Sequence, residues 1–155
     1  MGLDMYLYKN TYYQEVKSPG FAVPANIKPE RVTTIIEKVG YWRKANAIHG
    51  WFVKNVQAGQ DDCDEYPVRI RQLKELLDTV NKTIEAYRRD PKSCAEILPV
   101  TEGFFFGDYE YDEWYLEDLE ETKVILTEAL TEAVDWENVD RIDSVWHSFT
   151  YCSSW

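Results

Sequence analysis

The sequence predicts one α+β domain spanning residues 1–155, in which about three helices pack against a small, mostly antiparallel sheet. Three observations lead to this prediction. Both ends of the chain alternate polar and apolar residues as half-buried strands do, three interior stretches repeat apolar residues at helical spacing, and the length suits a single domain. We expect the N-terminal and C-terminal strands to pair with each other.

Three stretches are expected to form strands, and each is recognised by its side-chain pattern. Residues 3–8 and 145–152 alternate between apolar and polar side chains. Residues 31–39 include a run of β-branched side chains that favours a strand, although a helix is also compatible with them. Residues 18–29 contain three of the six prolines and are expected to form a loop.

Three helices are expected where apolar residues recur every three or four positions. They cover residues 41–57, 67–87 and 112–133, and the last of them begins at an N-capping aspartate. Residues 93–98 suit a short helical turn, and the sequence GFFFG at 103–107 suits a short apolar strand or a buried loop. These segments account for the helical part of the expected fold.

The charge of the chain excludes several classes of partner. It has 17 basic and 28 acidic residues, so its net charge is −11. Such a chain is repelled by the phosphates of a nucleic-acid duplex and by an anionic membrane surface. No apolar run approaches the roughly 18 residues of a membrane span, and no signal peptide is visible. We therefore expect no duplex partner and no membrane partner.

Cysteines and standard motifs give no catalytic or metal site. Cys63, Cys94 and Cys152 form neither a CxxC pair nor an even framework, which favours a reducing, cytoplasmic location without disulfides. The seven glycines form no phosphate-binding loop, and neither GxSxG nor HExxH occurs. The acidic loop 61–65 lacks the EF-hand pattern and is expected to be solvated. We assign no catalytic residue, no metal ligand and no cofactor, and favour a function without catalysis.

A first candidate site lies in the expected helix 41–57. Asn46 and His49 project beside the apolar stripe next to Trp42, and buried polar groups need a hydrogen-bond partner. That partner is either the protein core or a ligand, and both interpretations stay open. Arg43 and Lys44 lie one turn away and form a basic spot within an acidic chain, which suits a small anion such as a phosphate.

A second candidate is the aromatic segment 104–115, in which aromatic and acidic side chains alternate. Aromatic rings can stack on bases, and carboxylates can accept hydrogen bonds from a base or a ribose. The alternative is a helix entry that is simply packed by aromatic side chains. If the two segments meet, the predicted ligand-binding residues are Trp42, Arg43, Lys44, Asn46, His49, Phe105, Asp112, Trp114 and Tyr115.

Several strings of rare residues resemble a known group of proteins. They are YWRKANAIHGWFV at 41–53, DDC at 61–63, EGFFFG at 102–107, YDEWY at 111–115 and SSW at 153–155. Together with the opening GLDMYL, they resemble an uncharacterised family of small bacteriophage and prophage proteins. The resemblance implies a viral protein that acts in the host cell cytoplasm, but no reaction and no catalytic residues.

Three functions remain as hypotheses. By analogy with other small phage proteins, the chain is expected to counter host defences by binding and sequestering a nucleotide-like immune signal, as a non-catalytic sponge. The second hypothesis is an acidic inhibitor that covers a basic host protein with residues 108–121. The third is a phosphodiesterase-like hydrolase that uses His49 with Asp112 or Glu113. A homodimer is compatible with all three.

Overall fold

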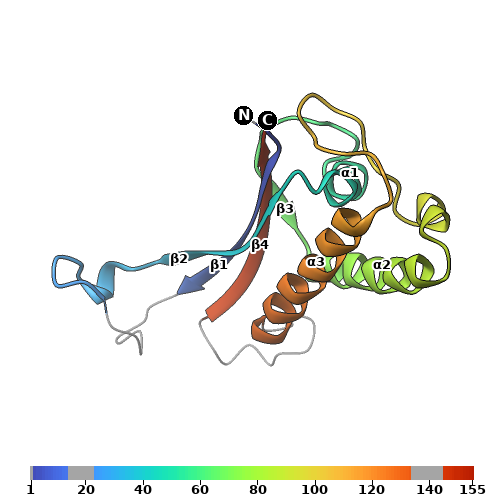
Figure 1. The fold of residues 1–155 in the computed structure, drawn as a ribbon. Helices are drawn as coiled ribbons and strands as arrows, with labels where there is room; N and C mark the ends of the chain where they lie inside the picture. The colour runs from blue at the N-terminus through green and yellow to red at the C-terminus, as the bar shows by residue number, and fades with distance from the viewer. Residues whose placement is uncertain (1, 14–22, 134–144) are drawn as a thin grey trace.

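The structure, a computed structural model, describes residues 2–13, 23–133 and 145–155 (Figure 1). Its sheet has four antiparallel strands in the order β2-β1-β4-β3. Their bounds are Asp4–Tyr13 for β1, Thr34–Arg43 for β2, Tyr66–Val68 for β3 and Val145–Ser154 for β4. The predicted α+β class and the pairing of the two terminal strands are confirmed, because β1 and β4 are neighbours at the centre of the sheet.

Period-two alternation gives the sheet one apolar face. Leu3, Met5 and Leu7 are fully buried, whereas Asp4, Tyr6 and Tyr8, which alternate with them, are half-buried on the opposite face. All three helices lie on the apolar side of the sheet in Figure 1. The sheet and the helices therefore share one hydrophobic core.

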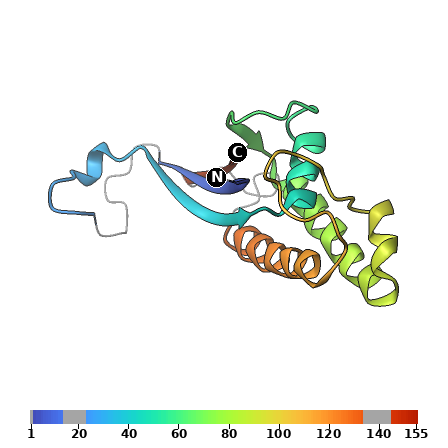
Figure 2. The ribbon, with the colours of Figure 1, turned by 45° about the horizontal axis from the view of Figure 1, so that its top comes forward.

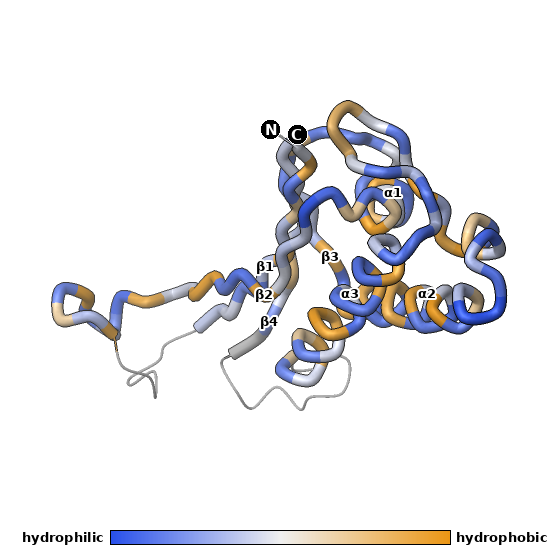
Figure 3. The backbone as a smooth tube through the Cα atoms, viewed as in Figure 1, coloured by the Kyte–Doolittle hydropathy of each residue, from blue (hydrophilic) through white to orange (hydrophobic). Residues whose placement is uncertain are grey.

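The helices are α1 (Asn46–Asn55), α2 (Ile70–Arg89) and α3 (Glu113–Glu132), with short 3-10 helices at Pro29–Arg31 and Pro91–Glu96. Helices α2 and α3 pack against each other, and both alternate hydrophobic and hydrophilic residues along their length (Figure 3). No helix within the described ranges combines the length and the apolar character that crossing a membrane requires. In Figures 1 and 2 the distal ends of β1 and β2 project away from the helices.

Two polar contacts fix α3 to the sheet. The indole nitrogen of Trp42 donates to Thr122 Oγ1 over 2.8 Å, and both side chains are buried. Near the other end of α3, the buried Lys9 ammonium contacts Glu132 at 2.9 Å and Glu37 at 3.2 Å. Since both contacts join β-strands to one helix, they hold α3 against the sheet.

The N-terminal end of α3 follows the prediction closely. The Asp112 carboxylate accepts hydrogen bonds from the backbone nitrogens of Trp114 and Tyr115, at 3.0 and 3.1 Å. These two bonds satisfy N–H groups that have no partner within the helix. The predicted N-cap is therefore confirmed.

The expected helix 41–57 is wrong in its first turn. Strand β2 continues to Arg43 because Tyr41 and Trp42 pair with Tyr6 and Met5 of β1, and α1 begins only at Asn46. Trp42 therefore reaches the core from a strand and not from a helical stripe. A strand near 31–39 is confirmed, but it starts at Thr34.

Two further boundaries differ from the prediction. The second helix starts at Ile70, three residues after Pro67, because residues 66–68 pair with β4. Residues 103–107 form neither a strand nor a buried loop: Phe106 is buried, but Phe104 is 78% and Phe105 50% exposed. The expected loop 18–29 lies outside the described residues up to position 22 and is mostly irregular from there to Lys28.

Candidate functional site

A pocket of about 290 Å³ lies where the β2–α1 connection, the loop 100–112 and the start of α3 meet. Six of the predicted ligand-binding residues line it: Arg43, Lys44, Asn46, Asp112, Trp114 and Tyr115. Three further carboxylates, which the sequence analysis did not assign to this site, also line it: Asp108, Glu110 and Asp118. The pocket is thus formed by residues from both of the candidate segments.

Asn46 builds the wall between α1 and the loop. Its amide nitrogen donates to the backbone oxygens of Phe106 and Asp108, at 3.2 and 2.8 Å, and its side-chain oxygen accepts from the Thr101 nitrogen at 3.0 Å. Both of its donor hydrogens are therefore used by the protein. Asn46 positions the loop and has no donor left for a ligand.

Close backbone approach shapes the same wall. A Cβ atom at Gly50 of α1 would lie only 2.0 Å from Thr101 Oγ1, so a side chain at this position would push the loop away. Gly107 has φ +97, and a Cβ there would lie 3.0 Å from the Lys44 Cβ. Lys44 itself has φ 60 and Phe105 has φ 62, conformations that are uncommon for residues with side chains. Such strain often gathers at functional sites.

Three tyrosine hydroxyls hold the loop in shape. Tyr115 donates to the Leu98 carbonyl over 2.6 Å, Tyr111 accepts from the Val100 nitrogen, and Tyr109 bonds both backbone groups of Gly103. Burial raises the pKa of the Tyr115 hydroxyl strongly, so this group stays a neutral donor. These rings are used for structure, whereas Trp114 is 71% exposed at the pocket.

The two cations of the pocket are not neutralised by neighbours. Among the described residues, neither Arg43 nor Lys44 forms an ion pair. Four carboxylates line the pocket with them, so the lining is net negative when all are ionised. Both signs of charge are therefore available to a ligand.

The carboxylates differ in how far the protein already uses them. Asp112 Oδ1 caps α3, and Asp108 Oδ1 accepts from the backbone nitrogens of Tyr109 and Glu110. The Asp118 carboxylate is half-buried, and no described residue donates a hydrogen bond to it. It is thus the most desolvated free acceptor of the pocket.

The acidity of Asp118 is also unusual for a carboxyl group. Burial, followed by repulsion from Glu121, Glu117 and Asp112, raises its pKa from about 4 to about 7. It therefore changes charge in the physiological pH range. A carboxyl group with this property in a pocket is a recognised pointer to a functional site.

Three of the predicted binding residues lie outside the pocket lining. Trp42 is 1% exposed and bonded to Thr122, and Phe105 is exposed with its ring against Phe104, at a centroid distance of 4.3 Å. His49 is fully buried behind Phe106, with the two rings edge to face at 5.1 Å. The structure therefore gives these residues structural surroundings, and we leave them out of the proposed site.

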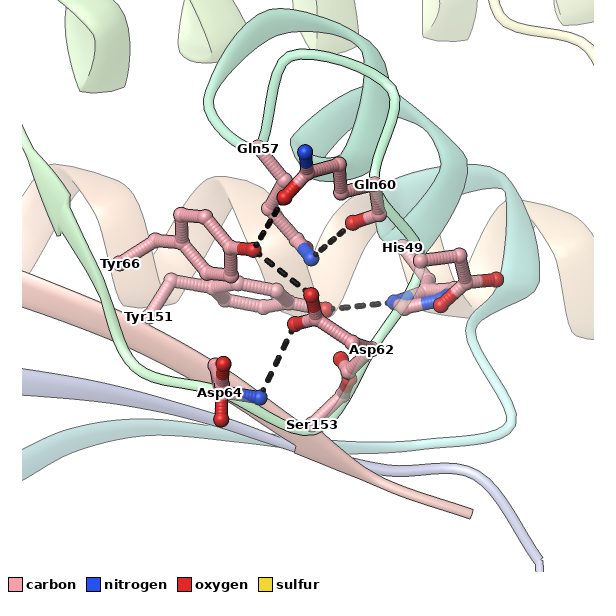
Figure 4. A network of polar contacts seen from close by, with 9 residues as sticks. His49, Gln57, Gln60, Asp62, Asp64, Tyr66, Tyr151 and Ser153 are labelled. Atoms are coloured by element: carbon pink, nitrogen blue, oxygen red, sulfur yellow. Dashed lines mark hydrogen bonds and ion pairs between the residues drawn. The ribbon is translucent and has the colours of Figure 1, made fainter.

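His49 belongs to a separate polar network, shown in Figure 4. Its Nδ1 contacts the hydroxyl of Tyr151 at 2.8 Å, and its Nε2 contacts Asp61 at 3.0 Å. Burial lowers the pKa of His49 even though Asp61 favours its charged form. Both ring nitrogens are occupied by protein atoms, so His49 has no free nitrogen for a substrate.

The acidic loop 61–65 is connected to this network. Asp62 accepts from the Asp64 nitrogen at 3.0 Å and from the Tyr66 hydroxyl at 2.8 Å, while Ser153 donates to its backbone oxygen (Figure 4). No three His, Cys, Asp or Glu residues in the described part of the chain are arranged to hold a metal ion. The network stabilises the connection between α1 and β3.

Comparisons with protein-family models, with curated proteins and with solved structures find no match to this chain. The function must therefore be argued from the geometry and chemistry of the pocket.

Proposed function

We propose that this chain binds a small nucleotide-like ligand in the pocket at the start of α3 and sequesters it without chemical change. The observation that carries the proposal is the combination of unpaired cations, a half-buried free carboxylate and an exposed indole around one cavity. Arg43 and Lys44 are placed to hold a phosphate, Trp114 to stack on a base, and Asp118 to accept hydrogen bonds. A purely anionic ligand would be repelled by the carboxylates.

The size of the cavity limits the ligand. Sites for small molecules usually enclose about 300 to 1,000 Å³, and 290 Å³ lies at the lower end of that range. The pocket therefore suits one nucleotide unit. A larger signal, such as a cyclic oligonucleotide, would place one unit in the pocket and leave the rest in contact with the outer surface.

Sequestration, and not turnover, fits the residues around the cavity. The hydrolase hypothesis needs His49, which lies outside the pocket with both nitrogens bonded to Tyr151 and Asp61. The pKa of Asp118 is about 7, so this lining residue is the group to test for acid–base catalysis. In the setting that the resemblance to phage proteins implies, a stoichiometric binder would lower the free concentration of an immune signal.

A ligand panel tests the proposal directly. We expect nucleoside monophosphates, cyclic nucleotides or ADP-ribose to raise the melting temperature, because a ligand bound only by the folded state stabilises it. At 100 times the Kd the gain is about 2.7 kcal/mol, or roughly 5 to 10 °C for a chain of this size. No shift across the panel would refute the proposal. Recovery of the bound nucleotide unchanged after denaturation would distinguish a sponge from an enzyme.

The surface next to the pocket supports a second candidate, an acidic inhibitor of a host protein. A shallow groove there is lined by Glu117, Glu120 and Glu121 together with the exposed side chains of Trp114 and Val124. Aromatic anchors within a charged rim are typical of protein interfaces. Glu120→Lys would weaken this activity but leave the nucleotide-induced thermal shift in place, because Glu120 lines the groove and not the pocket.

A further inference from the structure

Apart from its two cations and the Trp114 indole N–H, the free side-chain hydrogen-bonding groups of the pocket are carboxylates. At the α1 wall of the pocket, the uncharged side-chain donor is the Asn46 amide. It donates both of its hydrogens to backbone oxygens of the loop. The Tyr115 hydroxyl donates to the Leu98 carbonyl. The free acceptors that remain are carboxylates, which when ionised only accept hydrogen bonds. A base edge that faces these carboxylates is therefore selected by its N–H donors.

Asp118 is the carboxylate best placed to make that selection. It projects from α3 one turn after Trp114, so the two side chains are neighbours on the helix surface. The Trp114 ring is 71% exposed, whereas the Asp118 carboxylate is half-buried and has no donor among the described residues. A base that stacks on the indole brings its edge toward the carboxylate.

A carboxylate has two coplanar oxygens and pairs best with two adjacent donors. Guanine offers this arrangement, since its N1–H and its 2-amino group lie side by side on one edge. Adenine presents one donor and one acceptor at the corresponding edge, and xanthine replaces the 2-amino group by a carbonyl oxygen. In both cases an acceptor on the base would face a carboxylate oxygen, which leaves buried polar atoms unpaired.

We propose that the ligand of this pocket carries a guanine base, whose N1–H and 2-amino group are bound by the Asp118 carboxylate while Trp114 stacks on the ring. This inference rests on the proposed nucleotide-binding function and makes it more specific. Arg43 and Lys44 then face the phosphate. A single side chain recognises the base in this arrangement, so substituting Asp118 should change which base is preferred.

Titration of GMP, IMP, AMP and XMP by calorimetry at pH 8 tests the inference. The pKa of Asp118 is about 7, so its carboxylate is ionised under these conditions. We expect GMP to bind at least about tenfold more tightly than IMP, which lacks the 2-amino group, and AMP and XMP to bind more weakly still.

The variant Asp118→Asn provides the decisive comparison. An asparagine amide presents one acceptor and one donor, which match adenine as well as the O6 and N1–H of guanine, so the preference for GMP over AMP should be lost. The matched control is Glu128→Gln, an exposed residue of the same helix outside the pocket, which should keep the preference for GMP. Circular dichroism checks that both variants fold.

The outcomes separate this inference from the function on which it rests. If the wild-type chain binds none of the four nucleotides, and no ligand of the wider panel raises its melting temperature, the guanine inference and the proposed function are both refuted. Binding of AMP as tightly as GMP would refute the guanine inference and leave nucleotide binding intact. A preference for GMP that survives Asp118→Asn would show that another group reads the base. If that variant does not fold, the order of GMP, IMP and XMP on the wild-type chain still decides.

Discussion

The pocket at the start of α3 and the network around His49 use similar polar side chains in opposite ways. In the network, the buried His49 ring has a protein partner at each nitrogen. In the pocket, Arg43 and Lys44 form no ion pair within the described ranges, and Asp118 has no donor there. The His49 ring is thus satisfied by the fold, although Gln57 Oε1 of the same network has no partner among the described residues. The pocket leaves its two cations and Asp118 open to a ligand.

The contrast teaches how to tell a structural polar cluster from a binding site. A histidine on an apolar helix face attracts attention in a sequence, but its hydrogen bonds decide its role. Polar groups that form hydrogen bonds within the protein stabilise the fold. A buried charge without a partner destabilises the fold until a ligand pairs with it. Substitutions in the two regions should therefore have opposite effects on stability.

The largest effect is expected for His49→Ala. The substitution opens a cavity and leaves the buried Tyr151 hydroxyl and Asp61 without their partner, so the free energy of unfolding should fall by about 3 kcal/mol. Urea denaturation measures this loss. Lys54→Ala, at an exposed position of the same helix, should change stability by less than about 0.5 kcal/mol.

Ligand binding provides the second half of that test. The molecules of His49→Ala that remain folded should bind nucleotides as the wild-type chain does, because His49 does not line the pocket. A folded variant that has lost binding would show that the network and the pocket are not separate.

Asp118→Asn should change stability in the opposite direction, by raising the free energy of unfolding. The pKa of Asp118 in the folded state lies near 7, above its usual value near 3.8, so its contribution to stability is complete below pH 3.8 and is lost as the pH rises through 7. The asparagine variant lacks this loss. Its stability relative to the wild type should grow by on the order of 2 kcal/mol between pH 5 and pH 8.

Thermal denaturation across that pH range measures the difference. Burial and repulsion from Glu121, Glu117 and Asp112 raise the pKa of Asp118, and the cations Arg43 and Lys44 line the same pocket. A stability difference that does not depend on pH would mean that this carboxyl titrates normally. Glu128→Gln serves as the control, since it lies on the exposed face of α3.

Much of the fold could be predicted because it depends on local patterns. The alternation of Leu3, Met5 and Leu7 predicted β1, and the hydrogen-bonding capacity of Asp112 predicted the start of α3. The boundary between β2 and α1 could not be found in this way. Residues 41–43 fit a helical stripe, and only their pairing with β1, far away in the sequence, makes them a strand.

The candidate site was predicted in part for the same reason. Arg43, Lys44 and Trp114 are charged or bulky residues near a strand or helix end, and such positions are often exposed. Asp118 is not among the predicted residues, because in the sequence it is one of several carboxylates in an acidic helix entry. Its spacing of four from Trp114 on a helix was the signal that could have found it. The hydrogen bonds that occupy Asn46 and His49 depend on tertiary contacts and have no local signal.

Trp114→Ala should weaken nucleotide binding about tenfold, because a stacked aromatic side chain contributes roughly 1 to 3 kcal/mol per base. The stability of the fold should hardly change, since the ring is 71% exposed. Phe104→Ala is the matched control: this ring is 78% exposed but lies outside the pocket, so binding should be retained. Equal losses in both variants would move the ligand from the pocket to the wider aromatic surface.

The smallest effect is expected for Arg43→Gln, which removes one of the two unpaired cations. An exposed cation that contacts a phosphate contributes about 1 kcal/mol, so affinity should fall about fivefold. The loss should shrink as salt is raised, because the contact is screened. Arg88→Gln removes the same charge from an exposed position on α2 and should leave the affinity unchanged. If both variants lose affinity equally, the phosphate is attracted by the overall charge of the protein and not by the pocket, and the difference between the open and the satisfied region would lose its functional meaning.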